Sequence, residues 1–189
     1  MRLPRSFLSY LINYECDDEN FVDEIVCNFH PNLDISESDL SKLIKMEYKP
    51  NAGDSEEYNG SKCGRATVAE NRNATGEFLS ELATDEAWEI KYRVALNPNI
   101  DGKVADLLIG DGKCEINSDK ELILSGLGIN SKTDLESLKK LANNENINVR
   151  SAVFQNKSST SEIKAIAEQN GIDPNFGTSG SRLIWWTIN

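Results

Sequence analysis

Apolar residues recur three and four positions apart along most of the chain, which is the spacing of one face of an α-helix. The clearest sets are Phe78, Leu79, Leu82 and Ala83, and Leu135, Leu138, Leu141 and Ala142. A sustained alternation of apolar and polar residues, which would indicate half-buried strands, does not occur. The pattern therefore predicts an all-α protein.

The helical pattern repeats around four asparagines. These anchor residues are Asn71, Asn97, Asn130 and Asn156, with spacings of 26, 33 and 26 residues. An apolar residue stands three positions before each anchor, namely Val68, Val94, Leu127 and Val153. Three copies also share a base six positions before the anchor (Arg65, Lys91, Arg150) and a leucine eleven positions after it (Leu82, Leu108, Leu141). The longer middle spacing fits an inserted loop around residues 111–115, and the repeat predicts stacked helical hairpins.

Local signals suggest how each hairpin begins and ends. Ser/Thr-x-x-Glu patterns predict capping boxes that start at Ser118, Thr133 and Ser159. Asp85 and Asn144 are placed to cap the helix that follows them. We expect each anchor asparagine to end its helix in the left-handed conformation, which Asn tolerates. The repeated bases are expected to pair with acidic neighbours in the stack.

Several phrases around the anchors resemble the leucine-rich repeat variant family, whose unit is approximately V-R-x-A-V-A-x-N-P and then L-x-x-L-A-x-D. The matching segments are residues 67–71 (TVAEN), 94–99 (VALNPN), 82–85 (LATD) and 148–150 (NVR). This family is helical and is similar to HEAT and armadillo repeats. The resemblance covers about residues 64–170, and a weaker copy precedes it, in which residues 31–34 echo residues 98–101. It implies a right-handed α-solenoid, a HEAT-like superhelix of about four to five degenerate two-helix repeats with a helical N-terminal cap.

The chain departs from the family pattern in three ways. Only one copy keeps the Asn-Pro pair, and the third copy has Gly126 and Gly128 where small apolar residues are expected. A founding member of the family is associated with an iron–sulfur cluster, but this chain lacks the clustered cysteines that such a cluster needs. We therefore expect no cofactor.

The repeats divide the chain into four predicted parts. Residues 1–48 form an N-terminal helical cap that takes in the weaker copy, and residues 49–63 form a flexible acidic and polar loop. Residues 64–170 form the helical repeats, and residues 171–189 form a tail that closes the last repeat. The tail carries Trp185 and Trp186, which either cover the last hydrophobic face or anchor a partner.

Charge narrows the range of partners. The net charge of −11 argues against a nucleic-acid-binding surface and against an anionic membrane face. Residues 14–58 hold thirteen acidic residues and three lysines, a balance of about −10 that includes Asp17, Asp18 and Glu19. That stretch is either a solvated face or a surface that binds a basic groove. No apolar run is long enough for a membrane span and no signal peptide precedes the repeats, so we expect a cytoplasmic protein.

The chain shows no constellation of catalytic or metal-binding residues. Its four cysteines are scattered without a C-x-x-C pair, and His30 is the single histidine, next to Pro31 in a predicted turn. We therefore expect no metal site and no enzymatic activity. Trp88 and Tyr92 share one helical face beside Arg93, where they either fill a layer between repeats or bind a partner.

These observations favour a non-catalytic protein–protein interaction module that binds another protein of unknown identity. The alternative is an acidic inhibitor or nucleic-acid mimic, of the immunity or phage defence-antagonist type, that blocks a basic groove of its partner. A HEAT-like enzyme is a third, less favoured reading. The oligomeric state stays open.

Overall fold

The computed structural model describes residues 34–45, 61–110 and 117–174, in which helices joined by turns and loops occur and no strand is present. The helices are α3 (Glu37–Ile44), α4 (Ser61–Glu70), α5 (Gly76–Leu82), α6 (Trp88–Leu96), α7 (Gly102–Gly110), α8 (Asn117–Ile129), α9 (Leu135–Ala142), α10 (Ile147–Gln155) and α11 (Ser161–Gln169). The prediction of an all-α protein is therefore confirmed for this part of the chain.

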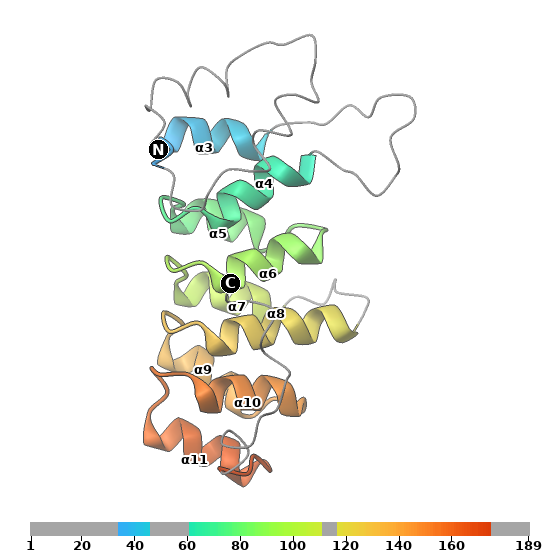
Figure 1. Ribbon diagram of the computed structural model, residues 1–189, viewed down its shortest axis with the longest axis vertical. Coiled ribbons are helices and arrows are strands. Elements are labelled where there is room, and N and C mark those ends of the chain that lie inside the picture. Colours follow the sequence, from blue (N-terminus) through green and yellow to red (C-terminus); the bar gives the residue numbers. More distant parts are fainter. Residues whose placement is uncertain (1–33, 46–60, 111–116, 175–189) are drawn as a thin grey trace, which may run out of the picture.

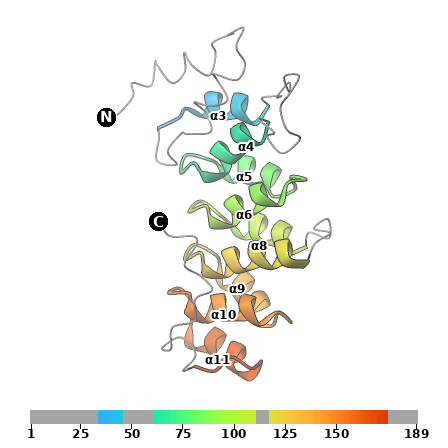
Figure 2. The same cartoon turned by 45° about the vertical axis from the view of Figure 1, so that its right-hand side comes forward.

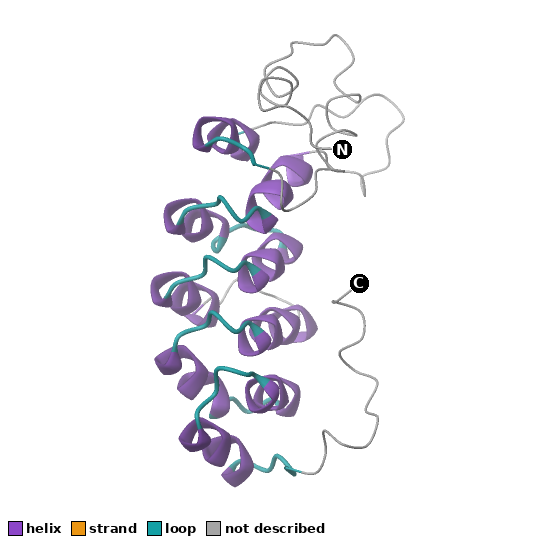
Figure 3. Ribbon diagram, turned by 60° about the vertical axis from the view of Figure 1, so that its left-hand side comes forward, coloured by secondary structure: helices purple, strands orange, loops and turns teal. Residues whose placement is uncertain are grey.

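The helices lie in two rows that run along the long axis of the molecule (Figures 1 and 3). Helices α4, α6, α8 and α10 contact one another in that order and form the first row. Helices α5, α7, α9 and α11 do the same in the second row, and α3 packs on α4 at one end. Figure 2 shows that the order of the stack follows the chain from α3 to α11. Each hairpin therefore contacts mainly the hairpins before and after it.

The repeated apolar residues form the core of this stack. Val68, Val94, Leu127 and Val153, three positions before each anchor, are all 0% exposed. The repeated leucines Leu82, Leu108 and Leu141 are each 1% exposed. Burial of one such side chain stabilises a fold by about 1.5–3 kcal/mol, so these positions supply much of the energy that holds neighbouring hairpins together.

Helices α9 and α11 of the second row are capped one residue later than the sequence pattern suggested. Asp134 and Thr160 are the N-caps of α9 and α11, and their side chains accept hydrogen bonds from the amides of Ser137 and Ile163. The preceding hydroxyls have another role. Thr133 and Ser159 donate to the carbonyl oxygens six residues earlier, at 2.7 Å in both cases. They therefore satisfy carbonyls near the end of the preceding helix.

Three further expectations about local structure need correction. Ser118 lies inside α8, so it caps nothing, and α8 begins one residue earlier. Asp85 and Asn144 stand two residues before the N-cap positions of α6 and α10, and they accept hydrogen bonds from the backbone amides of Ala87 and Asn146 at 2.8 Å. They therefore brace the turn between helices rather than cap the helix itself.

Element boundaries also differ from the predicted divisions. Helix α4 begins at Ser61, inside the range 49–63 that we predicted as a loop. Part of the additional length of the middle repeat, which we predicted as an inserted loop, is helical: α8 has 13 residues, whereas α6 and α10 have 9 each. For the weaker N-terminal copy, the predicted alignment of residues 31–34 with residues 98–101 places Asp34 opposite Asp101. The N-cap of α3 is Ser36, two positions after Asp34, so this alignment is shifted by two residues. Its residues Leu40 and Leu43 are buried in α3, as core positions should be.

No described helix combines the length and the apolar character that crossing a membrane requires.

Candidate interaction surface

The four anchor asparagines do not adopt the left-handed conformation that we expected. Asn97 has φ −65° and ψ 134°, and Asn156 has φ −64° and ψ 129°, which is extended backbone. Among the described residues only a glycine, Gly171, has positive φ. Helices of the first row therefore end because the chain turns into an extended segment, and the role of the asparagines lies in their side chains.

Three of the four anchor side chains, those of Asn97, Asn130 and Asn156, join two repeats. Asn97 Nδ2 donates to the carbonyl oxygens of Ala69 and Asn71, at 2.7 and 3.1 Å. Asn130 donates to the corresponding carbonyls of Ala95 and Asn97, both at 2.9 Å, and Asn156 to those of Gly128 and Asn130, at 2.7 and 2.9 Å.

The amide oxygen of each anchor points the other way, into its own turn. It accepts the backbone N–H two residues on, at 2.8 to 3.0 Å. The four asparagines are between 0% and 9% exposed. This asparagine ladder therefore holds the turns of successive repeats in fixed register.

The anchors define equivalent positions in the first row and show where the copies differ. The half-buried position five residues before the anchor holds Ala66, Tyr92, Ser125 and Ser151 in the four copies. The position four residues before it holds Thr67, Arg93, Gly126 and Ala152. Only α6 carries large side chains at both positions. Since the stack forms with small residues in the other three copies, the large ones in α6 are not a requirement of the repeat.

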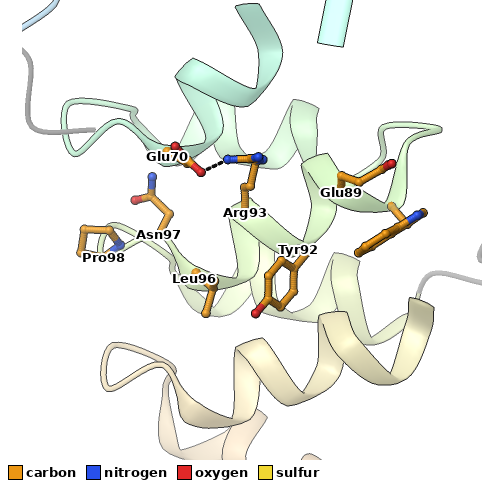
Figure 4. A pocket seen from close by; sticks show the side chains of 8 residues that line it. Glu70, Glu89, Tyr92, Arg93, Leu96, Asn97 and Pro98 are labelled. Carbon is orange, nitrogen blue, oxygen red and sulfur yellow. Dashed lines mark ion pairs between the residues drawn. The ribbon is translucent and has the colours of Figure 1, made fainter. Parts of the chain in front are cut away.

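These large side chains line a surface depression of about 440 Å³ on α6 (Figure 4). Trp88, Tyr92 and Arg93 all contribute, so the structure brings together the three residues that we selected on this helix. Glu70, Glu89, Leu96, Asn97 and Pro98 complete the lining. None of these five was selected as a partner-binding residue from the sequence. Asn97 is itself an anchor, and Glu70, Leu96 and Pro98 lie directly beside anchors, which is the signal that could have identified them.

The two aromatic residues combine both roles considered for them. Trp88 and Tyr92 are half-buried and pack against the hydrophobic core, yet both also line the depression. Gly126 of α8 makes room for the tyrosine ring. A Cβ atom at Gly126 would lie 3.0 Å from Tyr92 Cε2 and 3.5 Å from Leu96 Cδ2. The absence of a side chain at Gly126 therefore determines where the Tyr92 ring rests.

The charged groups of the depression are arranged around one ion pair. Arg93 of α6 pairs with Glu70 of α4, as Figure 4 shows, with side chains 40% and 33% exposed. Burial lowers the pKa of Arg93, although a guanidinium remains protonated at neutral pH. Glu89 adds a second carboxylate to the lining. The Asn97 side chain forms part of the wall of the depression, and its nitrogen and oxygen both already bond to backbone groups of the ladder.

The repeated bases lie deeper and serve the stack. Arg65 Nε lies 2.7 Å from Asp85 Oδ2, and these side chains are 19% and 7% exposed, so the expected acidic partner is confirmed for this copy. Arg150 instead donates to the backbone carbonyls of residues 144 and 145, both at 2.7 Å. Lys91 is 1% exposed. The bases therefore do not form an exposed basic ridge.

The outward face of the second row has a different character. Lys140 Nζ lies 2.5 Å from Asp106 Oδ1, and Lys139 Nζ lies 3.3 Å from Glu162 Oε1. These exposed pairs link α9 to α7 and to α11. The hydrogen bond from Lys140 to Asp106 raises the pKa of the lysine. Exposed ion pairs of this kind add little stability.

The remaining candidate residues lie outside the described part of the chain. They are Asp17, Asp18 and Glu19 in the acidic stretch and Trp185 and Trp186 in the tail. Their proposed contacts with a partner stay predictions. Among the residues that the structure describes, no group of three or more His, Cys, Asp or Glu side chains could hold a metal ion.

Comparison with known proteins returns no relative. No protein-family model matches the chain, and neither a curated protein nor a solved structure matches it significantly. The resemblance to the leucine-rich repeat variant family therefore depends on the repeat residues themselves.

Proposed function

We propose that this protein is a non-catalytic interaction module built as a short right-handed α-solenoid, similar to HEAT repeats and to the leucine-rich repeat variant family. The proposed partner is another protein, which binds the exposed face of the first row. Support for the solenoid comes from the asparagine ladder and the two rows of helices. Support for binding comes mainly from the depression on α6.

The depression carries this proposal because it departs from the repeat. Residues that hold a repeat array together recur in each copy, as the anchors and the buried apolar residues three positions before them do. Trp88, Tyr92 and Arg93 do not recur, and they cluster at a partly exposed site. Trp, Tyr and Arg are the side chains most enriched at the energetic centres of protein interfaces. A binding role explains this clustering, whereas stacking alone does not require it.

The chemistry of the site also favours binding over catalysis. No serine, cysteine or histidine lines the depression, and its one arginine is paired with Glu70. The lining therefore lacks a nucleophile with an adjacent base. It offers aromatic and apolar surface with a few charges, which suits the recognition of a side chain.

Affinity capture with matched variants tests this function. The full-length protein is used as bait in a lysate of its native cells, beside Trp88→Ala and Leu135→Ala, and captured proteins are quantified by mass spectrometry. Leu135 is a suitable control because it is a large apolar side chain, 50% exposed, at the start of α9 in the second row. The captured partner is then purified, and its affinity for each bait is measured by calorimetry.

We expect Trp88→Ala to weaken that affinity at least tenfold, since truncation at an interface hot spot costs about 2 kcal/mol or more. Leu135→Ala should bind like the wild type, and circular dichroism should show equal helicity for the three baits. A partner that binds both variants equally well would contradict a docking site on α6.

Deletion of one period tests the solenoid. Removal of residues 72–97 joins Asn71 to Pro98 and leaves the remaining hairpins with matching ends. Because each repeat of a solenoid contacts only its neighbours, the shortened chain should keep its helicity per residue. Loss of helical structure throughout the chain would argue for a globular bundle with a single core.

The acidic stretch motivates the second candidate function, an inhibitor that mimics nucleic acid. Residues 14–58 carry a charge of about −10, but only residues 34–45 of that stretch are described. Association with a basic groove should weaken steeply with added salt, because exposed charges are screened over about 10 Å at 0.1 M. DNA should also compete for the same partner. Binding that is independent of salt and insensitive to DNA would exclude this mode.

A further inference from the structure

We propose that residues 183–186 of the tail dock on the first row of helices and cover Trp88. They follow the edge of the stack at which α10, α8 and α6 begin. This docking lies within the chain and requires no partner protein. It bears on the proposed function, because a partner that binds Trp88 must displace the tail.

Exposed apolar side chains mark this edge of the first row. Leu122 of α8 is 45% exposed and Ile147 of α10 is 52% exposed. Ile147 stands nine positions before its anchor asparagine, as Trp88 does in α6, and Leu122 stands eight positions before its own. The Asn148 side chain of α10 donates to the Glu121 carboxylate of α8, which joins the two helices beside these apolar residues. We call Ile147, Leu122 and Trp88 the apolar edge.

The described chain ends on the same side of the stack. A short turn joins the end of a second-row helix to the start of the next first-row helix, as between Ala142 of α9 and Ile147 of α10. Helix α11 belongs to the second row, and its C-cap residue Asn170 donates to Ala142 O at 3.2 Å. The end of α11 therefore lies beside the end of α9, and residues 175–189 start near the apolar edge.

The tail is long enough to follow the apolar edge as far as α6. Packed helices lie about 8–10 Å apart, so the path from α11 past α10 and α8 to α6 is roughly 24–30 Å. Residues 175–184 can span about 33–36 Å when they are fully extended. Residues 183–186 can therefore reach Trp88.

The chemistry of these four residues fits the surface. They read Leu-Ile-Trp-Trp, the only run of four consecutive apolar residues in the chain. In the depression, Glu70 pairs with Arg93, Asn97 bonds within the ladder, and Glu89 also interacts within the protein. The surface that remains for a ligand is aromatic and apolar, and it comes from Trp88, Tyr92, Leu96 and Pro98. An uncharged aromatic segment is therefore the occupant that this lining favours.

The last repeat offers the tail less apolar surface than the apolar edge does. Phe154 and Ile166 of that repeat are already half-buried. Lys164 Nζ lies 5.7 Å from the centroid of the Phe154 ring and occupies one of its faces. Because hydrophobic stabilisation grows with the apolar area removed from water, the more exposed Leu122 and Ile147 favour docking along the edge.

The solvent exposure of the tryptophans provides the test. The full-length protein is labelled with 5-fluorotryptophan, and the ¹⁹F signals of its three tryptophans are assigned with Trp→Phe variants. The change of each signal between H₂O and D₂O reports how far that ring is exposed. The double variant Leu122→Ser/Ile147→Ser disrupts the apolar edge. Leu135→Ser is the matched control, because Leu135 is 50% exposed and lies at the start of α9, on the opposite edge.

We expect Trp185 and Trp186 to be shielded from solvent in the wild type. The double variant should lower the ratio of docked to free tail about tenfold or more, as for the loss of central contact residues. Leu135→Ser should match the wild type, and circular dichroism should show equal helicity for all variants. Conversely, Trp185→Ser/Trp186→Ser should increase the exposure of Trp88.

Tail tryptophans that are fully exposed in the wild type would overturn the proposal. Shielding that persists unchanged in Leu122→Ser/Ile147→Ser would also overturn it, because the tail would then pack elsewhere. Shielding that disappears on dilution would assign the contact to the tail of a second copy and exclude docking within the chain. None of these measurements uses the partner, so a partner whose capture depends on Trp88 would support the proposed function even if the tail proved free.

Discussion

Replacement of Asn97 by alanine tests the asparagine ladder directly. The substitution removes two donated hydrogen bonds, to Ala69 O at 2.7 Å and Asn71 O at 3.1 Å, and one accepted from the Asn99 amide at 2.8 Å. A typical hydrogen bond contributes about 1 kcal/mol net to stability, and a buried polar group left without a partner costs about 1–3 kcal/mol. Asn97 is 1% exposed, so water replaces these bonds poorly. We expect a loss of about 3 kcal/mol, a large share of the roughly 5–15 kcal/mol typical of a domain.

Asn99→Ala is the matched control. Asn99 also donates two bonds through its amide, to Arg72 O at 2.6 Å and Ala74 O at 2.9 Å, but it is exposed. Water can satisfy the carbonyls that it leaves, so we expect a loss of no more than about 1 kcal/mol.

Urea unfolding followed by circular dichroism measures both losses. With a slope of about 2 kcal/mol per molar urea, Asn97→Ala should lower the midpoint by about 1.5 M and Asn99→Ala by about 0.5 M or less. Equal midpoints for the two variants would refute the idea that the ladder stabilises the stack through its buried bonds.

Asn97→Asp separates shape from hydrogen bonding. It keeps the acceptor oxygen but turns both donated bonds into contacts between oxygen atoms, and it buries a negative charge. At pH 7 it should therefore destabilise the protein more than alanine does. The loss should shrink in acid, because protonation of the carboxyl removes the charge.

Two further substitutions probe the packing of the stack and its response to pH. Gly64→Ala should lower the free energy of unfolding by about 1–3 kcal/mol, because its new Cβ atom would overlap the backbone carbonyl of Leu43 in α3. Gly110→Ala, which meets nothing within 4 Å, should leave the urea midpoint unchanged or raise it slightly; equal losses in the two would contradict the close approach of α3 and α4. For Asp134, burial alone would raise the pKa, but hydrogen bonds from the Ser137 hydroxyl and from backbone amides hold the pKa below its ordinary value. The pKa of Asp134 in the folded protein lies below its value of about 3.9 in the unfolded chain, so the stability that Asp134 contributes is complete above about pH 4 and is lost as the pH falls through the folded pKa. The difference in melting temperature between wild type and Asp134→Asn should therefore shrink in acid. A difference that does not change with pH would contradict the direction of this pKa shift.

The repeat could be located from sequence because its signals are local and periodic. Core valines and leucines recur at set distances from the anchors, and burial on one face of a helix requires that spacing. The predictions of where helices begin and end were less accurate. Thr133 and Asp134 are both competent caps, and only the path of the chain shows that Asp134 bonds to the helix start while Thr133 bonds back to Leu127.

The role of the anchor asparagines could not be derived from local rules. Asparagine is common at left-handed helix ends, and that tendency led to a wrong prediction for Asn97 and Asn156. Their amides donate instead to carbonyls 26 to 28 residues away. Tertiary stacking decides this outcome, because two buried donor bonds outweigh a weak conformational preference.

The candidate site was likewise predicted only in part from the sequence. From sequence, Trp88, Tyr92 and Arg93 stood together on one helix, but nothing there indicated whether they were buried between repeats or exposed. The stacking of α4 and α8 on either side of α6 leaves these side chains partly buried. Glu70 of α4 pairs with Arg93, and the Tyr92 ring packs close to Gly126 of α8. The sequence by itself determined the helices, their period and their core, because those depend on residues a few positions apart. Only the tertiary structure determined the ladder and the depression, because both are made of groups from neighbouring repeats that stacking brings within bonding distance.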